Sequence, residues 1–388
     1  MTPKTFMLIA GEASGDLLAA ELVSALRGKL AGQPQFFGAG GAKMSAAGVD
    51  LAFDMTQHAV VGITDVLKNI LKFHRLFKQL LALAVERKPD VIIGADYGGF
   101  NLRFGQAVKK YVRENPFAQW EPKIVQFVSP QVWASRPGRA NKLERDYDLL
   151  LSIFPFEKDW YARRVPKLRV EFVGHPMIGR FVNDDLRWMR EPAEGAPAAN
   201  GEPRILLLPG SRQSELQHHL PPMLGALKLI GDKLPQAKVK MVLPNERLLQ
   251  LAKTLGATVE IQIGNLPQAL LWADVAIAST GTVTMECAFF GVPAVTLYKA
   301  SWLTYQIALR LITVKSLTMP NLLAGDTVYK EFLQYAATPE NLSHATLELL
   351  QDDAHREKIK SQLAGIIASL GEPGAPDRAA NAILSLFS

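Results

Sequence analysis

The chain has 388 residues, of which 48% are hydrophobic and 21% charged, close to the average for soluble globular proteins. This length predicts two domains or three, and the composition excludes disorder, collagen-like repeats and a disulfide-rich miniprotein. With 43 Lys and Arg against 37 Asp and Glu, the net charge of +6 fits anionic substrates or an anionic membrane surface and distinguishes neither. The single cysteine, Cys287, cannot form an internal disulfide, which fits a reducing compartment.

The apolar stretch at residues 6–10 is too short for the core of a signal peptide, and no run reaches the roughly 18 apolar residues of a membrane span. We therefore expect a soluble or peripheral protein in the cytoplasm. Short, near-continuous Val/Ile/Leu runs alternate with amphipathic helical stretches such as residues 17–30 and 66–85. Such runs are typical of strands covered on both faces of a parallel sheet, and their alternation with helices predicts a doubly wound α/β fold. The predicted strands are residues 6–10, 36–38, 91–95, 124–128, 149–153, 170–173, 205–208, 239–243, 259–263, 275–278 and 294–297.

The strand–helix alternation breaks at residues 190–203, a stretch rich in Pro, Gly and Ala that reads as a linker. We predict an N-terminal Rossmann-like domain over residues 1–190, a linker over 191–200 and a C-terminal Rossmann-like domain over 201–388. The last helices are allowed to return to the first domain. Ligands bind outside the carboxyl ends of the strands in open α/β folds, so we expect the two domains to face a cleft.

Two loops of the first domain could carry chemistry. Gly11-Glu12-Ala13-Ser14-Gly15-Asp16 follows the first strand and opens a helix, where free N–H groups favour an anion. An ordinary turn in which Ser14 or Asp16 caps the helix explains the same residues. Asp96 ends the strand at 91–95, a position that suits a general base, although an Asx-turn or an N-cap is the simpler alternative.

Two loops of the second domain suit phosphate groups. After residues 205–208 come Gly210, Ser211 and Arg212 at the start of a helix, where arginine can grip a diphosphate with two hydrogen bonds. A capping box formed by a serine and a nearby acid is the alternative. After residues 275–278 come Thr280, Gly281 and Thr282, and then Glu286, an acid that could accept from ribose hydroxyls or only interact with the helix dipole.

Other signals carry less weight. Asp146-Tyr147-Asp148 has a metal-binding pattern but precedes its strand, at the end away from the expected cleft. His218 and His219 read as a solvated helix face, Cys287 as a small core residue, and no His/Cys spacing suggests zinc. There is no Walker A sequence and no complete G-x-G-x-x-G, and we predict no nucleic-acid partner.

Two stretches could contact a membrane surface or pack on the protein. Residues 66–80 are basic and amphipathic, and residues 301–312 are apolar with aromatic residues at the start.

In their order along the chain, the motifs resemble the lipid-A-disaccharide synthase family, and the ordered set is far more specific than any one motif. They are residues 11–16, the Asp96 segment, Val128-Ser-Pro-Gln-Val-Trp133, Phe154-Pro-Phe-Glu157, Phe172-Val-Gly-His-Pro176, Leu208-Pro-Gly-Ser-Arg-Gln-Ser-Glu215, Ser279-Thr-Gly-Thr282 and Met319-Pro-Asn-Leu-Leu-Ala-Gly325.

The resemblance implies an inverting GT-B glycosyltransferase that joins UDP-2,3-diacylglucosamine to 2,3-diacylglucosamine 1-phosphate (lipid X) and releases UDP. It implies Asp96 as the catalytic base for the acceptor 6-hydroxyl, with the Gly210–Arg212 turn on the diphosphate. Further substrate contacts are implied for Glu12, Ser14, Thr280, Gly281, Thr282, Glu286, Asn321 and Gln334. No metal or cofactor is expected, because arginine and helix ends meet the charge of UDP. A homodimer at the inner-membrane surface is also implied.

Two segments depart from the family pattern. The Asp96 segment continues as Tyr97-Gly98-Gly99-Phe100, without the proline and second aspartate usual in the family, and residues 60–62 also differ. Acyl-chain preference therefore cannot be carried over. Another GT-B enzyme on a UDP-sugar, such as an N-acetylglucosamine transferase or 2-epimerase, and a non-catalytic nucleotide-sugar-binding protein are the alternatives.

Overall fold

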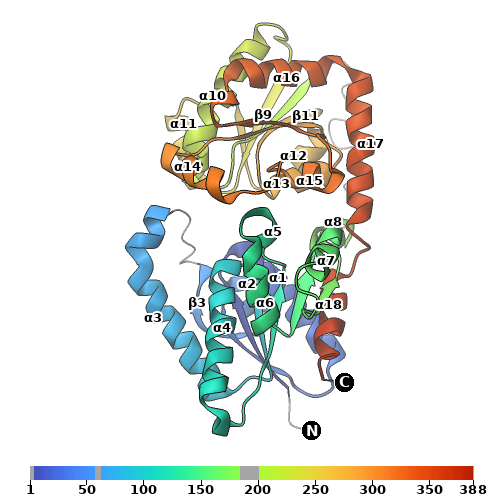
Figure 1. The fold of residues 1–388 in the computed structure, drawn as a ribbon. Helices are drawn as coiled ribbons and strands as arrows, with labels where there is room; N and C mark the ends of the chain where they lie inside the picture. Colours follow the sequence, from blue (N-terminus) through green and yellow to red (C-terminus); the bar gives the residue numbers. More distant parts are fainter. Residues whose placement is uncertain (1–3, 57–62, 184–200, 388) are drawn as a thin grey trace. The chain divides into compact units, whose positions relative to one another are not determined.

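The computed structural model describes residues 4–56, 63–183 and 201–387, which form two compact units. Unit 1 comprises Met1–Asp184 and Leu370–Ser388, and unit 2 comprises Asp185–Ser369. The expected linker at 191–200 and the variable segment at 60–62 lie outside the described residues. Each unit is a parallel sheet with helices on both faces, as the buried apolar runs predict (Figure 1).

Unit 1 contains a seven-stranded sheet of order β3-β2-β1-β4-β5-β6-β7, parallel throughout. The strand order reverses between β1 and β4, so the loops after these two strands flank a topological switch point, where open α/β sheets bind ligands. Its strands are β1 (Thr5–Ala10), β2 (Gln35–Gly40), β3 (Asp50–Asp54), β4 (Val91–Ala95), β5 (Lys123–Phe127), β6 (Leu149–Ser152) and β7 (Val170–Phe172).

The helices of unit 1 cover both faces of this sheet. The cluster that includes Met7, Ile92 and Ile124 packs beneath α3, α4 and α6. The predicted amphipathic helix is α3, whose Leu76, Leu80 and Ala84 are buried, while the side chains of its residues 63–72 are not described. The α-helices are α1 (Ala13–Lys29), α2 (Ala42–Ala46), α3 (Ile63–Arg87), α4 (Gly98–Glu114), α5 (Val132–Ser135), α6 (Ala140–Asp146), α7 (Pro155–Ala162), α8 (Pro176–Asn183) and α18 (Ala375–Leu384), with 3₁₀ turns η2 (Pro116–Ala118) and η3 (Pro137–Arg139).

Unit 2 contains a six-stranded parallel sheet of order β10-β9-β8-β11-β12-β13, with its switch point between β8 and β11. The strands are β8 (Arg204–Leu208), β9 (Lys238–Leu243), β10 (Glu260–Ile263), β11 (Val275–Ser279), β12 (Ala294–Tyr298) and β13 (Lys330–Leu333). The helices are α10 (Gln213–Gly231), α11 (Glu246–Thr254), α12 (Leu266–Trp272), α13 (Val283–Phe289), α14 (Trp302–Leu311), α15 (Met319–Ala324), α16 (Pro339–Gln351) and α17 (Asp353–Ser369), with the 3₁₀ turn η4 (Gln334–Ala336).

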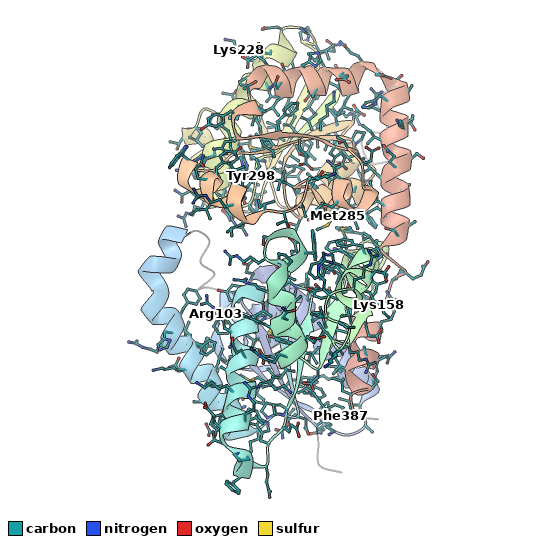
Figure 2. All side chains as sticks on the ribbon, in the orientation of Figure 1. Arg103, Lys158, Lys228, Met285, Tyr298 and Phe387 are labelled. Atoms are coloured by element: carbon teal, nitrogen blue, oxygen red, sulfur yellow. The ribbon has the colours of Figure 1, made fainter. Side chains whose placement is uncertain are left out.

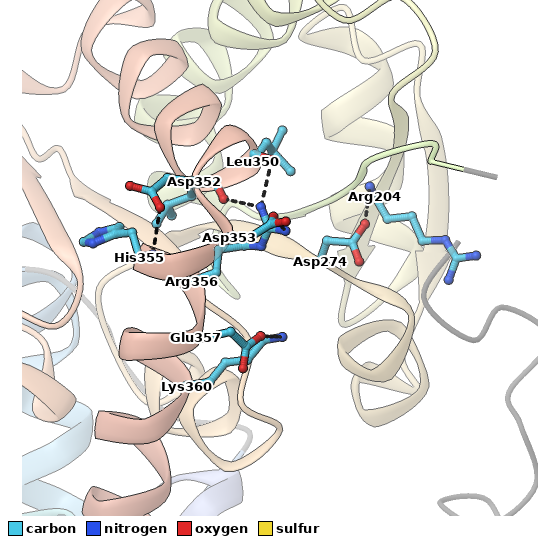
Figure 3. Close-up of polar contacts among 10 residues, drawn as sticks. Arg204, Asp274, Leu350, Asp352, Asp353, His355, Arg356, Glu357 and Lys360 are labelled. Carbon is cyan, nitrogen blue, oxygen red and sulfur yellow. Dashed lines mark hydrogen bonds and ion pairs between the residues drawn. The ribbon is translucent and has the colours of Figure 1, made fainter. Parts of the chain in front are cut away.

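Polar contacts fix two corners of unit 2 (Figure 3). The Asp274 carboxylate accepts from the Arg204 backbone N–H at 2.8 Å, which ties the amino ends of β8 and β11 together. At the corner between α16 and α17, the Arg356 guanidinium donates to the carbonyls of Leu349 and Leu350 at 2.7 and 2.8 Å. These carbonyls belong to the last turn of α16, which leaves them without partners inside that helix, so the arginine completes its C-terminus.

The last helix belongs to unit 1, where α18 packs against α1 and α8 (Figure 1). Arg378 of α18 donates from Nε to the carbonyl of Val173 at 2.8 Å, just after β7. The His175 backbone N–H donates to the carbonyl of Leu370 at 2.9 Å. The Nδ1 atom of His175 accepts from the Met177 N–H at 3.2 Å, and the ring lies against Phe154. This acceptor role requires a neutral imidazole.

His175 therefore makes the stability of unit 1 sensitive to acid. Burial, with a smaller contribution from Arg180, lowers the pKa of His175 from 6.5 to about 4. Between these values the unfolded chain binds a proton that the native chain does not, so stability falls as the pH drops from 6.5 and levels off below 4. The loss amounts to at most about 3 kcal/mol. We expect His175→Gln to remove this part of the acid limb in denaturation measured from pH 7 to pH 4.

The matched control is His344→Gln, because the His344 side chain is 83% exposed. Its pH dependence of unfolding should follow that of the unmodified protein. An unchanged acid limb in the His175 variant would contradict the assignment.

Candidate functional site

The first loop of interest joins β1 to α1 and lies beside the end of β4. Ser14 Oγ donates to Asp96 Oδ2 at 3.0 Å, so residues 82 positions apart meet across the switch point of the unit 1 sheet. Gly15 allows this approach, because a Cβ there would lie 2.9 Å from the Ala95 carbonyl oxygen. Ser14 thus contacts the proposed base instead of capping its own helix.

Asp16, which lies in α1, binds the backbone of another helix. Its buried carboxylate accepts from the N–H groups of Gly41, Lys43 and Met44 at 2.7, 2.9 and 3.1 Å. These donors lie at the start of α2, so Asp16 caps α2 and not the helix in which it stands. Glu12 is the N-cap residue of α1. Burial raises the pKa of Tyr97, and the nearby charge of Glu12 raises it further.

The backbone after β4 is unusual. Asp96 and Tyr97 have φ angles of 52° and 46°, and Val128, after the neighbouring strand β5, has a φ of 66°. This left-handed region is costly for residues with a side chain, most of all for a β-branched one, and such outliers cluster at functional sites. The N-cap of α4 is Tyr97, so Asp96 is not the cap that the simpler alternative predicted.

Two side-chain amides hold this turn. Asn101 Nδ2 and Gln126 Nε2 both donate to the Asp96 carbonyl oxygen, at 2.8 and 2.9 Å, and Gln126 also donates to the carbonyl of Val128 at 3.2 Å. Both side chains are buried, and their own oxygens, Asn101 Oδ1 and Gln126 Oε1, have no hydrogen-bond partner among the residues that the structure describes. We define this arrangement of Asn101, Gln126 and the Asp96 carbonyl as the amide clamp. Sequence analysis missed it, although a glutamine inside an apolar strand was a usable signal.

In unit 2 the loop after β8 places Arg212 at the start of α10. Arg212 pairs with Glu215 at 3.1 Å, and the Glu215 carboxylate also accepts from the N–H groups of Ser211 and Arg212 at 2.9 and 3.2 Å. The capping alternative is therefore present here, with Glu215 as the cap. Gly210 is required, because its φ is 123° and a Cβ would lie 2.5 Å from Glu215 Oε2.

The loop after β11 lies on the other side of the unit 2 switch point. Thr282 is the N-cap residue of α13, Gly281 and Thr282 are exposed, and Thr284 Oγ1 donates to the Gly281 carbonyl at 2.7 Å. Gly281 has a φ of 151°. Thr280 and Glu286 are half-buried at the two ends of this segment. Cys287 is fully buried, as predicted for a core residue, and burial raises its pKa.

Asn321 and Gln334 support loops from within. Asn321 is buried, and its amide donates to the Tyr329 carbonyl and to Glu331 while its oxygen accepts from the N–H groups of Val328 and Tyr329. Gln334 accepts from the Ala300 N–H at 3.0 Å and donates to the Ala300 carbonyl at 2.7 Å. The side-chain groups of Asn321 are thus fully used inside unit 2, and those of Gln334 bind the backbone N–H and carbonyl of a single residue, Ala300.

The prediction for His219 is wrong, because its ring is fully buried and not solvated. Nδ1 lies 2.9 Å from the Pro209 carbonyl, and Nε2 lies 3.0 Å from the Lys299 N–H nitrogen and 3.1 Å from the Lys299 carbonyl. Nδ1 faces only a carbonyl, which accepts, so in the neutral ring Nδ1 carries the proton and Nε2 accepts from the Lys299 N–H. Burial lowers the pKa of His219, which favours this neutral form. The ring joins the loops after β8 and β12, and Tyr298, at the end of β12, lies near Arg212 and Glu215.

Two further signals concern metals. Asp148 accepts from the Ile124 N–H at 2.8 Å and pairs with Lys109, and Asp146 pairs with Arg145, so both acids have structural partners. No group of three or more His, Cys, Asp or Glu suited to a metal occurs within residues 4–56, 63–183 and 201–387.

Comparisons with known proteins agree with the geometry. The family model described as lipid-A-disaccharide synthetase matches residues 6–382. The lipid-A-disaccharide synthase of Myxococcus xanthus is 35% identical to the chain, over 99% of the chain and 98% of that protein.

Solved structures show the fold. A putative UDP-N-acetylglucosamine 2-epimerase from Listeria monocytogenes superposes with a TM-score of 0.66 at 13% identity, covering 100% of this chain and 97% of the other. A calicheamicin glycosyltransferase gives a TM-score of 0.57 at 14% identity, covering 99% and 98%. The predicted two-domain α/β fold of the GT-B class is confirmed.

The amide clamp leads to a prediction about coupling. Asn101→Leu and Gln126→Met each remove one donor to the Asp96 carbonyl, but each also removes a buried oxygen without a partner. We expect each single change to cost less than about 1 kcal/mol of unfolding free energy. The double variant leaves the carbonyl without either amide, so its loss should exceed the sum of the two by about 1 kcal/mol.

Urea denaturation of the four proteins measures this coupling. Tyr147→Phe is the matched control, because it removes a single hydroxyl that donates to the Asn101 carbonyl at 2.6 Å and not to Asp96. Its loss should add to that of Gln126→Met without coupling. Strict additivity of Asn101→Leu and Gln126→Met would argue against a shared acceptor.

Proposed function

Because the chain belongs to the lipid-A-disaccharide synthase family, we propose that it transfers 2,3-diacylglucosamine from UDP to the 6-hydroxyl of 2,3-diacylglucosamine 1-phosphate. The protein is a glycosyltransferase of lipid A biosynthesis, and the observation that carries this is the family match over nearly the whole chain. The product would be the β-1,6-linked disaccharide 1-phosphate, with UDP as the leaving group. The putative epimerase structure from Listeria monocytogenes is only 13% identical and supports the fold alone.

We propose Asp96 as the general base that accepts the proton of the acceptor hydroxyl as its oxygen attacks the anomeric carbon. Asp96 ends β4 at the switch point, it is half-buried, and Ser14 orients one carboxylate oxygen. Oδ1 carries no hydrogen bond among the described residues and is the oxygen that would take the proton. A carboxylate with one oxygen held by Ser14, on a backbone held by the amide clamp, fits general base catalysis, which requires a fixed geometry toward the reacting hydroxyl.

We propose Arg212 as the residue that stabilises the departing diphosphate. Glu215 occupies one of its N–H groups, and the others remain for phosphate oxygens. Thr280, Thr282 and Glu286 follow the neighbouring strand of the same switch point and supply further contacts to the nucleotide. For Asn321 and Gln334, whose side chains hold backbone groups, we propose a supporting role behind these loops.

The test of the chemistry is disaccharide formation from the two purified lipid substrates. Asp96→Asn should lower turnover by about 10²–10⁴-fold, the usual contribution of general base catalysis, because an amide cannot accept the proton. The Kd for UDP, measured by calorimetry, should stay unchanged. The control Asp159→Asn alters an exposed carboxylate of α7 and should retain full turnover. Activity in the Asp96 variant, or no disaccharide from the unmodified protein, would overturn the respective assignment.

We further propose that unit 2 contacts the surface of the inner membrane through α14. Trp302, Leu309 and Ile312 are 64%, 58% and 38% exposed, and Tyr335, whose ring meets that of Tyr305 edge to face, is 73% exposed. Exposed Arg310 and Lys315 accompany them, which fits an anionic lipid surface. No described helix is long and apolar enough to cross a bilayer. The homodimer implied by the resemblance stays a prediction for sedimentation analysis.

Trp302→Ser with Leu309→Ser should therefore weaken cosedimentation with vesicles of phosphatidylglycerol and phosphatidylethanolamine by about tenfold or more, given the apolar area removed. Phe117→Ser is the control, since Phe117 is 96% exposed but lies on unit 1 without exposed apolar neighbours of its size among the described residues. Equal vesicle binding by both variants would contradict a role for α14.

A further inference from the structure

Three arginines of unit 1 have no carboxylate partner among the residues that the structure describes. Arg103 lies on α4 (Figure 2), Arg136 follows α5 and Arg139 ends η3. Arg103 and Arg136 are exposed and Arg139 is half-buried. Within residues 4–56, 63–183 and 201–387, none of the three forms an ion pair with a carboxylate, whereas Arg145 and Lys109 beside them do. We name these three residues the arginine cluster.

Arg136 and Arg103 each lie close enough to Arg139 for their charges to act on its guanidinium group. The pKa of Arg139 is lowered by burial first, and then by the charges of Arg136 and Arg103. Like charges held together cost free energy in the empty protein. An anion between them removes that cost, and arginine is the side chain that binds phosphate with two parallel hydrogen bonds.

The arginine cluster is held on the elements that follow β4 and β5, the strand that carries Asp96 and its neighbour. α4 begins at Gly98, two residues after Asp96, and a Cβ on Gly98 would lie 2.7 Å from Pro130 Cβ. The start of α4 therefore packs directly on the loop that follows β5.

Buried hydrogen bonds fix that loop and the helix after it. Trp133 Nε1 donates to the buried Glu157 carboxylate at 2.9 Å, and Ser129 Oγ lies 3.0 Å from Tyr161 Oη. Tyr147, just after α6, donates to the Asn101 carbonyl of α4 at 2.6 Å. The backbone that carries the arginines is thus fixed before any ligand binds, which lowers the entropic cost of binding.

We propose that Arg103, Arg136 and Arg139 bind a phosphate monoester, the anomeric phosphate of the acceptor sugar whose 6-hydroxyl faces Asp96. This inference rests on the proposed function. A hexosamine phosphate carries its 6-hydroxyl and its phosphate at two different positions of one ring, so it needs a base and a cationic site near each other. The loops after β4 and β5 offer both on one edge of the sheet.

The test compares two acceptors that differ only in this phosphate. With saturating UDP-sugar in neutral detergent, kcat/KM is measured for 2,3-diacylglucosamine 1-phosphate and for 2,3-diacylglucosamine. The unmodified protein should prefer the phosphorylated acceptor. Arg136→Gln with Arg139→Gln, and Arg103→Gln alone, should each raise KM for that acceptor by about tenfold or more, as expected for lost charge-assisted hydrogen bonds. KM for the other acceptor and the Kd for UDP should not change.

Arg163→Gln is the matched control, because Arg163 is an exposed arginine of unit 1 at the end of α7. It should keep the preference, and the cluster variants should melt no lower than the unmodified protein, because they lose like charges and no ion pair. If the cluster variants retain the preference between the two acceptors, the inference is overturned.

The phosphate monoester that binds the arginine cluster could instead belong to a lipid headgroup of the membrane. Vesicles with and without phosphatidic acid, which is also a phosphate monoester, provide the second arm. Loss of phosphatidic acid binding in the cluster variants, with acceptor preference intact, would assign the arginines to the membrane and overturn the acceptor site. If the unmodified protein forms no disaccharide, the proposed function fails separately. Calorimetry with glucosamine 1-phosphate, whose binding should weaken in the same variants and not in Arg163→Gln, then still tests the cluster.

Discussion

The carboxyl edge of the unit 1 sheet depends on how one carbonyl, that of Asp96, is held. Two consecutive residues in the left-handed region cost roughly 1–2 kcal/mol each, and a chain leaving a buried strand in this way must be held by other groups. Asn101 and Gln126 provide these from two different elements, α4 and β5. The sharp turn lets α4 begin at Gly98 and leaves the Asp96 carboxylate beside Ser14. The conformation of the Asp96 backbone therefore determines where the carboxylate of the proposed base lies.

In unit 2, other side chains hold the backbone of the loops that follow the strands. The neutral ring of His219 bridges Pro209 and Lys299, and Gln334 holds the next residue, Ala300, through both its backbone N–H and its carbonyl. Three loops that follow β8, β12 and β13 are thus linked by side chains that donate and accept in fixed directions. A parallel sheet aligns the ends of its strands, but only such cross-links decide the conformation of the loops beyond them.

The sequence predicted what depends on local pattern. Buried strands are continuous apolar runs, so nearly all of them were found within one or two residues. β3 and β13 were missed because they are edge strands with the charged residues Asp50, Asp54, Lys330 and Glu331, and the pattern of a buried strand is absent there. The contact between Ser14 and Asp96, 82 residues apart, follows from strand order, which the periodicity of one sequence does not contain. His219 was misread for the same reason: its partners lie on two other loops.

The two phosphate sites that we propose differ in whether an acid of the protein pairs with their arginines. Arg212 is paired with Glu215, whose carboxylate also occupies the N–H groups of Ser211 and Arg212 at the start of α10. A diphosphate there must share these donors with an internal acid, which limits its affinity and favours release of UDP after transfer. The arginine cluster has no such acid among the described residues, so an anion there relieves the repulsion that Arg103 and Arg136 exert on Arg139. A transferase of this kind requires both an acceptor that is held firmly by its phosphate and a nucleotide that can leave after transfer.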